Sequence, residues 1–243
     1  SEVVDVERCK FLMSLTDSDL EKFCVKKGKQ SQQLIIATRK YLSMVIERND
    51  GVVNQNYTQR LCNRMFSDSP ISLQDLSNNV KNFLLVDGRD YDMENCNPTI
   101  LLYLYKMHDL PHERLKEYVE HRKDFLKKTG TDKKTIIALM NMDEQRITGN
   151  RKVDSLIREV VTNKKRLVEL EADRINPHYL ELKKHSKNPL SSKQCAIIYY
   201  HEHVILRRCM DHYQAQVTVP MFDGFHSHGE CDLAVMNDLC KES

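Results

Sequence analysis

Two aspartates far apart in the sequence lie in or beside strand-like segments, positions from which they could bind magnesium. Asp92 lies in a short strand-like stretch that also carries Asp87, Asp90 and Glu94, and Asp223 lies beside a second apolar strand-like segment. A strand holds a carboxylate rigidly, and two such carboxylates can bind a pair of metal ions about 3.5–4 Å apart. Mg²⁺ takes one or two carboxylates from a protein and completes its shell with phosphates and water. The two aspartates are therefore candidate ligands of Mg²⁺ or Mn²⁺, ions that would activate an attacking hydroxyl and stabilise a leaving pyrophosphate.

The same residues also have a purely structural interpretation. Asp87 and Asp223 are each followed by glycine, and Asp-Gly is among the commonest dipeptides at hairpin turns. Either aspartate could serve only its turn, so the local pattern leaves both interpretations open.

The elements that would position these aspartates are few short strands among many helices. Apolar or alternating runs predict strands over residues 84–86, 89–93, 216–222 and 225–228. The first ~70 residues are interpreted as helical. Helix patterns and capping residues predict helices over residues 31–49, from Ser72 toward Leu84, and over 100–107, 112–128, 133–142, 152–172, 191–213 and 231–240. Asn97 before Pro98 is interpreted as a helix N-cap. The predicted fold class is α+β and mostly helical, with a small antiparallel sheet.

Composition limits the class of protein. The 243 residues include 40% hydrophobic and 30% charged residues, which is usual for a globular domain, and no window approaches 18 consecutive apolar residues. The eight cysteines form no CxxC pair, so we expect reduced thiols and an intracellular location. A zinc site can be drawn from His226, His228, Cys231 and Cys240, but this spacing matches none of the usual zinc patterns.

Charge is distributed unevenly along the chain. Residues 114–193 contain 20 Lys or Arg and 12 Asp or Glu, a net +8, so the rest of the chain carries −6 within the total of +2. The basic segment could neutralise a phosphate backbone or could form solvated helix faces. Lys164-Lys165-Arg166 is interpreted as such a solvated face that could also grip a template. Glu202 is interpreted as structural, and His201 and His203 should face apart on a helix.

Several motifs together resemble the TV-Pol family, the polymerase-like domains of transposons and viruses related to family A DNA polymerases and single-subunit phage-type RNA polymerases. The resemblance covers about Tyr57 to Cys240. The motifs follow in the family's order: ISLQDL from Ile71 and YDMENCNPTIL from Tyr91 to Leu101, then LP and LKEYVEHR ending at Arg122, then KKTIIALMN from Lys133 to Asn141, and MFDGF around Asp223. The chain departs from the family pattern at Asn97, where His is common, and after Asn141, where Met142-Asp143 replaces glycines.

The resemblance implies roles for individual residues. Asp92 and Asp223 would hold the metal ions, and Lys133 or Lys134 would contact the incoming triphosphate. Arg122 would support the same phosphates. Positions three and four residues from Arg122 hold Tyr118, Val119, Phe125 and Leu126, so no ion pair within its helix is available and Arg122 is either solvated or functional. Asn141 would lie near the nascent base pair. Asn97 would lie near the nucleotide sugar, where its short side chain predicts weak sugar discrimination.

The resemblance also implies a function and a domain division. We expect a nucleotidyltransferase, a DNA polymerase or primase that copies a nucleic acid template from nucleoside triphosphates in a virus or mobile element. A superfamily 3 helicase domain could follow in the same protein. Residues 1–70 would form an accessory helical region, and residues 71–243 would form a palm, split between 84–110 and 214–243, with fingers over 111–172. Two alternatives stay open: a non-catalytic helical nucleic-acid-binding module, with Asp92 and Asp223 far apart, and a protein-interaction domain without nucleic acid affinity.

Overall fold

The computed structural model describes the chain except residues 25–30, 49, 86–87, 215–216, 222 and 242–243. Its residues group into two compact units: the first contains residues 1–60, 65–92 and 205–243, and the second contains 61–64 and 93–204. This division differs from the predicted one. Residues 1–60 belong with 205–243 rather than to a separate accessory region, and residues 93–110 belong with the predicted fingers.

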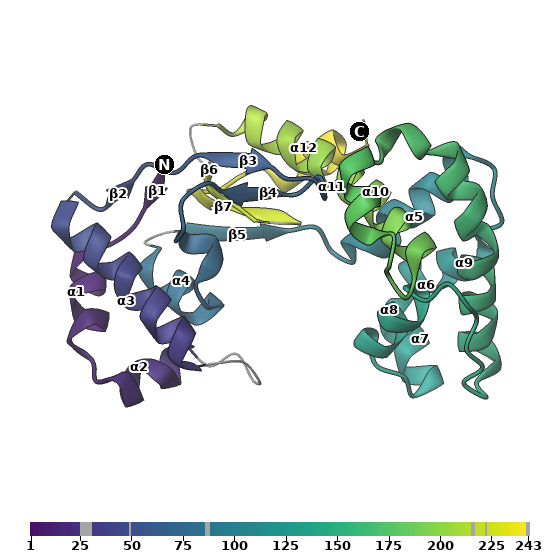
Figure 1. Ribbon diagram of the computed structural model, residues 1–243, viewed down its shortest axis with the longest axis horizontal. Helices are drawn as coiled ribbons and strands as arrows, with labels where there is room; N and C mark the ends of the chain where they lie inside the picture. The colour runs from purple at the N-terminus through teal and green to yellow at the C-terminus, as the bar shows by residue number, and fades with distance from the viewer. Residues whose placement is uncertain (25–30, 49, 86–87, 215–216, 222, 242–243) are drawn as a thin grey trace. The chain divides into compact units, whose positions relative to one another are not determined.

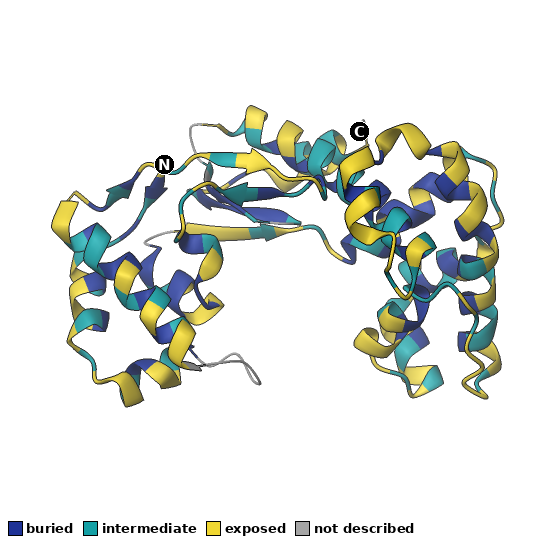
Figure 2. Ribbon diagram, viewed as in Figure 1, coloured by how far each residue is buried: buried dark blue, intermediate teal, exposed yellow. Residues whose placement is uncertain are grey.

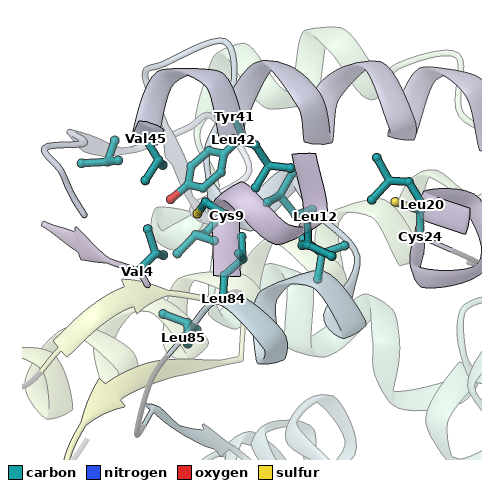
Figure 3. Close-up of a cluster of buried hydrophobic side chains, with 14 of the residues drawn as sticks. Val4, Cys9, Leu12, Leu20, Cys24, Tyr41, Leu42, Val45, Leu84 and Leu85 are labelled. Carbon is teal, nitrogen blue, oxygen red and sulfur yellow. The ribbon is translucent and has the colours of Figure 1, made fainter. Parts of the chain in front are cut away.

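The helices of the first unit surround an apolar core. They are α1 (Val6–Ser14), α2 (Asp17–Cys24), α3 (Ser31–Arg48) and α4 (Asn78–Leu84). Figure 3 shows how Cys9 and Leu12 of α1, Tyr41 and Leu42 of α3 and Leu84 of α4 converge in this core. Each of these side chains is fully buried. The predicted helix over residues 31–49 is confirmed at α3.

Short strands interrupt the N-terminal region, so its prediction as helical throughout is wrong. β1 (Glu2–Val3) pairs with β2 (Val52–Val53), and β3 (Tyr57–Gln59) pairs with β4 (Met65–Ser67), both antiparallel. The predicted capping box is present, but it opens only the 3₁₀ turn η1 (Leu73–Asp75), and α4 has its own cap at Ser77.

Glu2 holds these N-terminal elements together through its carboxylate. The side chain is buried and accepts hydrogen bonds from the Tyr41 hydroxyl (2.7 Å), the Tyr57 hydroxyl and the Leu73 backbone N–H (3.0 Å). Burial raises the pKa of Glu2, and the three donors oppose that shift. A buried carboxyl group requires such partners, so the bonds join β1, α3, β3 and η1 at one point.

The predicted small antiparallel sheet is confirmed. β5 (Gly88–Asp92), β7 (Gly224–His228) and β6 (Val217–Pro220) lie in the order β5-β7-β6, with an irregularity between Val217 and Val219 (Figure 1). Val86 and Gln216, which end two of the predicted strands, and Asp87 of the first predicted turn lie outside the described residues. The strands place both predicted aspartates in the first unit.

Side chains alternate between the two faces of this sheet. Val219 belongs to the core with α1–α4. Tyr91 stacks on Phe225 on the opposite face, at 5.6 Å between ring centroids, against the end of α11 (Pro189–His212) and α12 (Leu233–Lys241). The Tyr91 hydroxyl accepts from the Cys231 backbone N–H at 2.7 Å. Both faces of the sheet are therefore anchored by apolar packing.

Within the part that the structure describes, the second unit is built of helices. They are α5 (Cys96–Met107), α6 (Glu113–Glu120), α7 (Arg122–Thr129), α8 (Lys133–Met140), α9 (Arg151–Leu170), the 3₁₀ turn η2 (Ala172–Arg174), α10 (Pro177–Lys183) and the first part of α11. The buried residues of α9 recur along one side of the helix, whereas α5 is buried on most sides (Figure 2). The sequence predicts a helix end at Gly130 and a cap at Thr131 or Asp132, and the structure has Gly130, with φ 65°, as the C-cap of α7 and Asp132 as the N-cap of α8.

Two predicted helix boundaries in this unit are wrong. The helix predicted over residues 112–128 is divided at His121 into α6 and α7. α5 begins at Cys96, so its N-cap is Asn95, in the left-handed region with φ 57°, and Asn97 lies inside the first turn. Pro98 is tolerated there because the first N–H groups of a helix have no intrahelical partner.

Lys164 ties three helices of the second unit together. It lies in the apolar stripe of α9 and is 1% exposed, so its interpretation as part of a solvated face is wrong. Its ammonium donates to the carbonyls of Met140 (3.0 Å) and Met142 (2.5 Å) and to Ser191 Oγ (2.6 Å). Burial lowers the pKa of Lys164 to about 8, and nearby Asp143 opposes that shift. The lysine thus caps the C-terminus of α8.

We expect Lys164→Met to lower the free energy of unfolding by about 2–4 kcal/mol, because the two carbonyls and the hydroxyl lose a buried charged donor. Chemical denaturation followed by circular dichroism measures this change. Lys165→Met, at the exposed neighbouring position, is the control and should change stability by less than about 0.5 kcal/mol. Equal stability of the two variants would contradict the role assigned to Lys164.

Candidate functional site

The β5–β7 register brings the two predicted metal ligands to neighbouring strands. Asp92, the last residue of β5, pairs with Gly224, the first residue of β7, and Asp223 directly precedes that glycine. The Met221 N–H donates to the Gly224 carbonyl at 2.8 Å, which closes the predicted β6–β7 hairpin. Phe222 lies outside the described residues. The strands next to the two aspartates are therefore neighbours, and a separation of the carboxylates short enough to share a metal pair stays a prediction.

Gly224 allows β5 to approach β7 closely at this point. A β-carbon at position 224 would lie 2.6 Å from Asp92 Oδ1 and would collide with the Tyr91 carbonyl oxygen. Any side chain at this position would therefore push β5 and its carboxylate away from β7. The glycine of the Asp-Gly pair is therefore required by strand packing, in addition to any part it has in the turn.

The carboxylates on this face repel one another. Partial burial raises the pKa of Asp92, and the charges of Asp90 and Asp223 raise it further, whereas Lys81 opposes the shift. Asp90 and Asp92 lie two residues apart on β5 and so share a face of the sheet. The fold therefore places like charges together, an arrangement that a cation would relieve.

Two further polar residues lie near this face: Lys81, for which the sequence predicts no role, and His226, which it suggests only as a zinc ligand. Lys81 is buried on α4, with its Nζ 3.9 Å from Met221 Sδ. His226 is buried on β7 opposite Asp90, with its Nε2 3.7 Å from Asp90 Oδ1. Burial lowers the pKa of His226, Lys81 lowers it further, and Asp90 opposes them. The signal available for Lys81 was its place three residues before Leu84, on the apolar side of a helix.

The donors fit magnesium better than zinc. Among the described residues, no group of three or more His, Cys, Asp or Glu side chains is arranged to hold a metal ion. The zinc site drawn from His226, His228, Cys231 and Cys240 is therefore not found. Asp92 and Asp223 offer hard oxygen donors only, and Mg²⁺ accepts two protein carboxylates when phosphates and water complete its shell.

The other predicted site residues lie in the second unit. Asn97 and Asn141 line one small cavity together with Gln194, so the structure brings these two predicted residues near one another. Asn141 is half-buried at the C-cap of α8 and accepts a hydrogen bond from Cys195 Sγ at 3.7 Å. Asn97 is not the N-cap of α5, since Asn95 has that position, and Asn97 instead lines the cavity.

Lys133 and Lys134 lie at the exposed beginning of α8. At about 100° per residue, Asn141 is about 20° from Lys134 around the helix axis and about 80° from Lys133. Ile137, which lines the small cavity, lies on the same side. Lys134 therefore shares a helix face with Asn141 more closely than Lys133 does.

Arg122 and Glu202 both form ion pairs with distant residues. Arg122 donates to Glu94 Oε1 and to Asn95 Oδ1, each at 3.0 Å. The expectation that Arg122 is solvated if it is not functional is wrong, because its partner lies 28 residues earlier rather than in its own helix. Glu202 is buried and accepts two 2.8 Å bonds from Arg64, as expected for a structural carboxylate.

Comparison with protein-family models, with curated proteins and with solved structures gives no match. In the part of the chain that the structure describes, no helix has the length and apolar character needed to span a membrane.

We expect Asp92→Asn to raise the free energy of unfolding at pH 7 by less than about 1 kcal/mol, because it removes a charge near two other carboxylates and solvent screens that repulsion at an exposed position. The raised pKa of Asp92 sets the pH dependence: folding favours its protonated form, a stabilisation present at low pH and lost as pH rises through the folded pKa. The advantage of the variant should therefore vanish below the ordinary pKa of aspartate. Denaturant titrations from pH 3 to pH 7 test this, and an equal difference at both ends would refute it.

Proposed function

We propose that the protein catalyses template-directed nucleotidyl transfer by a two-metal mechanism, as a DNA polymerase, a primase or both, in the replication of a virus or mobile element. The observation that carries the proposal is the β5–β7 register, which sets Asp92 beside the residue that follows Asp223. Mutual repulsion of these carboxylates supports a role in binding cations. The motif order that resembles the TV-Pol family supports the reaction class.

In this proposal Asp92 and Asp223 hold Mg²⁺ or Mn²⁺. When bound, the metal ions supply activation of the attacking hydroxyl and stabilisation of the leaving pyrophosphate. The chain's own contribution is to hold Asp92 at the end of β5 and Asp223 directly before β7. Lys81 helps to keep Asp92 ionised, because its charge opposes the upward shift of the pKa of Asp92.

The second unit supplies the residues proposed to bind the nucleotide. Lys134, with Lys133 as the alternative, and Arg122 would bind the triphosphate, because both side-chain types carry charge suited to phosphate. Asn141 and Asn97 would bind near the base and sugar. Both side chains line one cavity, but its volume of about 10 Å³ would have to increase to admit a nucleoside. Weak discrimination between ribose and deoxyribose at Asn97 stays a prediction.

The alternative of a non-catalytic nucleic-acid-binding module is less well supported. It requires Asp92 and Asp223 to lie far apart, whereas their strands are neighbours. It also relied on the basic middle segment, and Lys164 of that segment is buried. A nucleic acid template, a superfamily 3 helicase domain in the same protein and a reducing intracellular compartment remain proposals that rest on the resemblance and on cysteine usage.

We expect Asp223→Asn to reduce nucleotide incorporation by about 10³-fold or more, because the substitution keeps the shape of the side chain and removes the charge that binds metal. Primer extension and de novo synthesis with magnesium measure the loss. Asp238→Asn is a matched control, since Asp238 is an exposed aspartate of α12 paired with Lys241. If Asp223→Asn retains full activity while Asp238→Asn behaves as wild type, the metal site lies elsewhere.

We expect Lys134→Ala to raise the KM for nucleoside triphosphate about tenfold or more and Lys133→Ala to raise it by less than about threefold, because a lost contact between an ammonium and a phosphate costs more than a solvated charge. The two variants remove the same charge from the same helical turn, so each serves as a control for the other. Equal effects, or a larger effect of Lys133→Ala, would show that sharing a helix face with Asn141 does not determine which lysine contacts the triphosphate.

A further inference from the structure

A cavity of about 470 Å³ lies in the second unit, between the start of α5, the end of α6 and the start of α7. It is lined by Glu94, Asn95, Thr99 and residues 119–124. This volume is within the range of sites for small ligands. The cavity lies within one unit, so its chemistry can be derived from that unit alone.

Asn95 brings an unused donor to this cavity. The residue is 8% exposed, and its Oδ1 accepts the hydrogen bond from Arg122 Nη1. That bond fixes the orientation of the amide, because the reversed amide would set a donor against a donor. The Nδ2 atom is buried and has no hydrogen-bond partner among the described residues. Buried polar groups are nearly always paired, so this donor points to a ligand that carries an acceptor.

Arg122 is a half-buried cation whose carboxylate partner is exposed. Its side chain is 19% exposed, whereas the side chain of Glu94 is 81% exposed. The guanidinium has five N–H donors, and two of them bond to described residues. An exposed carboxylate contributes little to an ion pair, since it must be held in place against water. A more strongly bound anion can therefore displace the Glu94 carboxylate from the Arg122 guanidinium.

The rest of the lining does not decide the charge of the ligand. α7 begins at Arg122, and its N-cap residue, His121, makes no side-chain capping bond, which favours an anion. Lys123 is positive, whereas Glu120 and Asp124 are negative. All of these side chains except that of Arg122 are exposed, so solvent screens them. This cavity is distinguished by the hydrogen-bond donors of two side chains shielded from solvent, the buried Asn95 amide and the half-buried Arg122 guanidinium.

We propose that this cavity binds a phosphate group, which displaces the Glu94 carboxylate from Arg122 and also accepts a hydrogen bond from Asn95. A phosphate offers several oxygens that match the fork of a guanidinium. Glu94 is then an internal competitor that holds Arg122 in place while the cavity has no ligand. The inference extends the role proposed above for Arg122, and only the source of the phosphate, a nucleotide or a nucleic acid backbone, rests on the proposed function.

The test is calorimetric titration with inorganic pyrophosphate, without divalent metal and without template. We expect Arg122→Ala to weaken binding about tenfold or more and Arg122→Lys to weaken it several-fold, because an ammonium cannot form the fork. Asn95→Asp should also weaken binding, because it replaces a donor with a charge of the wrong sign. Glu94→Gln should tighten binding about two- to fivefold, since it removes the competitor.

The control is Arg166→Ala, which removes another arginine of the same unit that pairs with an exposed glutamate, Glu169. It should change affinity by less than about twofold. The opposite signs of Glu94→Gln and Arg122→Ala are the decisive result. Unchanged or weaker binding in Glu94→Gln would overturn the proposal even if Arg122→Ala fails to fold.

Two further titrations identify the source of the phosphate. A nucleoside triphosphate and a single-stranded oligonucleotide without terminal phosphates are each titrated into the same variants. The ligand whose affinity follows the order of the variants is the source of the phosphate, and if neither follows it, both proposed sources are wrong. Because these assays contain no metal, Asp223→Asn should bind pyrophosphate as the wild type does. Loss of incorporation in that variant therefore tests the proposed function separately.

Discussion

The pairing of β5 with β7 is the interaction on which the arrangement of the first unit depends. It joins Asp92 to Gly224, residues whose numbers differ by 132. Closing a flexible loop of this length costs about 4 kcal/mol beyond a constant, and doubling it would add only about 0.6 kcal/mol. Apolar packing on both faces of the sheet offsets that cost: Val219 packs with the α1–α4 core, and Phe225 packs with α11 and α12.

The strand pairing also imposes an electrostatic penalty. It sets Asp92 near Asp90 and Asp223, and the pKa of Asp92 is raised first by burial and then by these two charges. A fold selected for stability alone would place a neutral side chain at position 92. Residues that lower the stability of a fold are typical of sites retained for chemistry. Here the loss is confined to one place, because apolar packing fixes the strands on both faces. Lys81 reduces the penalty without neutralising the cluster.

Local patterns were enough to predict part of this structure. Alternation and the Asp-Gly pair predicted the β6–β7 hairpin, and Gly130 and Asp132 marked helix ends, because strands, turns and caps depend on residues close in sequence. The strands β1 and β2 have two residues each, too few for any periodicity to appear.

Residues that depend on distant partners were not predictable in this way. Lys164 was interpreted as solvated because its acceptors are two backbone carbonyls more than 20 residues earlier, which no side-chain pattern reveals. The sequence around Arg122 reveals only ion-pair partners within its own helix, whereas its partner Glu94 precedes α5. In the candidate site, the two aspartates were found from their own neighbours, whereas Lys81 and His226 became visible only through the packing of α4 and β5.

In homologues of this chain, the residue at position 224 reports on the packing of the sheet, whereas the residues at positions 92 and 223 report on the chemistry of the site. The close approach of Asp92 Oδ1 and of the Tyr91 carbonyl oxygen leaves no room for a side chain at position 224, whatever the charges nearby. A homologue that keeps this glycine but carries neutral residues at positions 92 and 223 would have inherited the sheet and lost the proposed metal ligands. A homologue that keeps both aspartates and replaces the glycine must have shifted one strand against the other, so its carboxylates would no longer be the same distance apart.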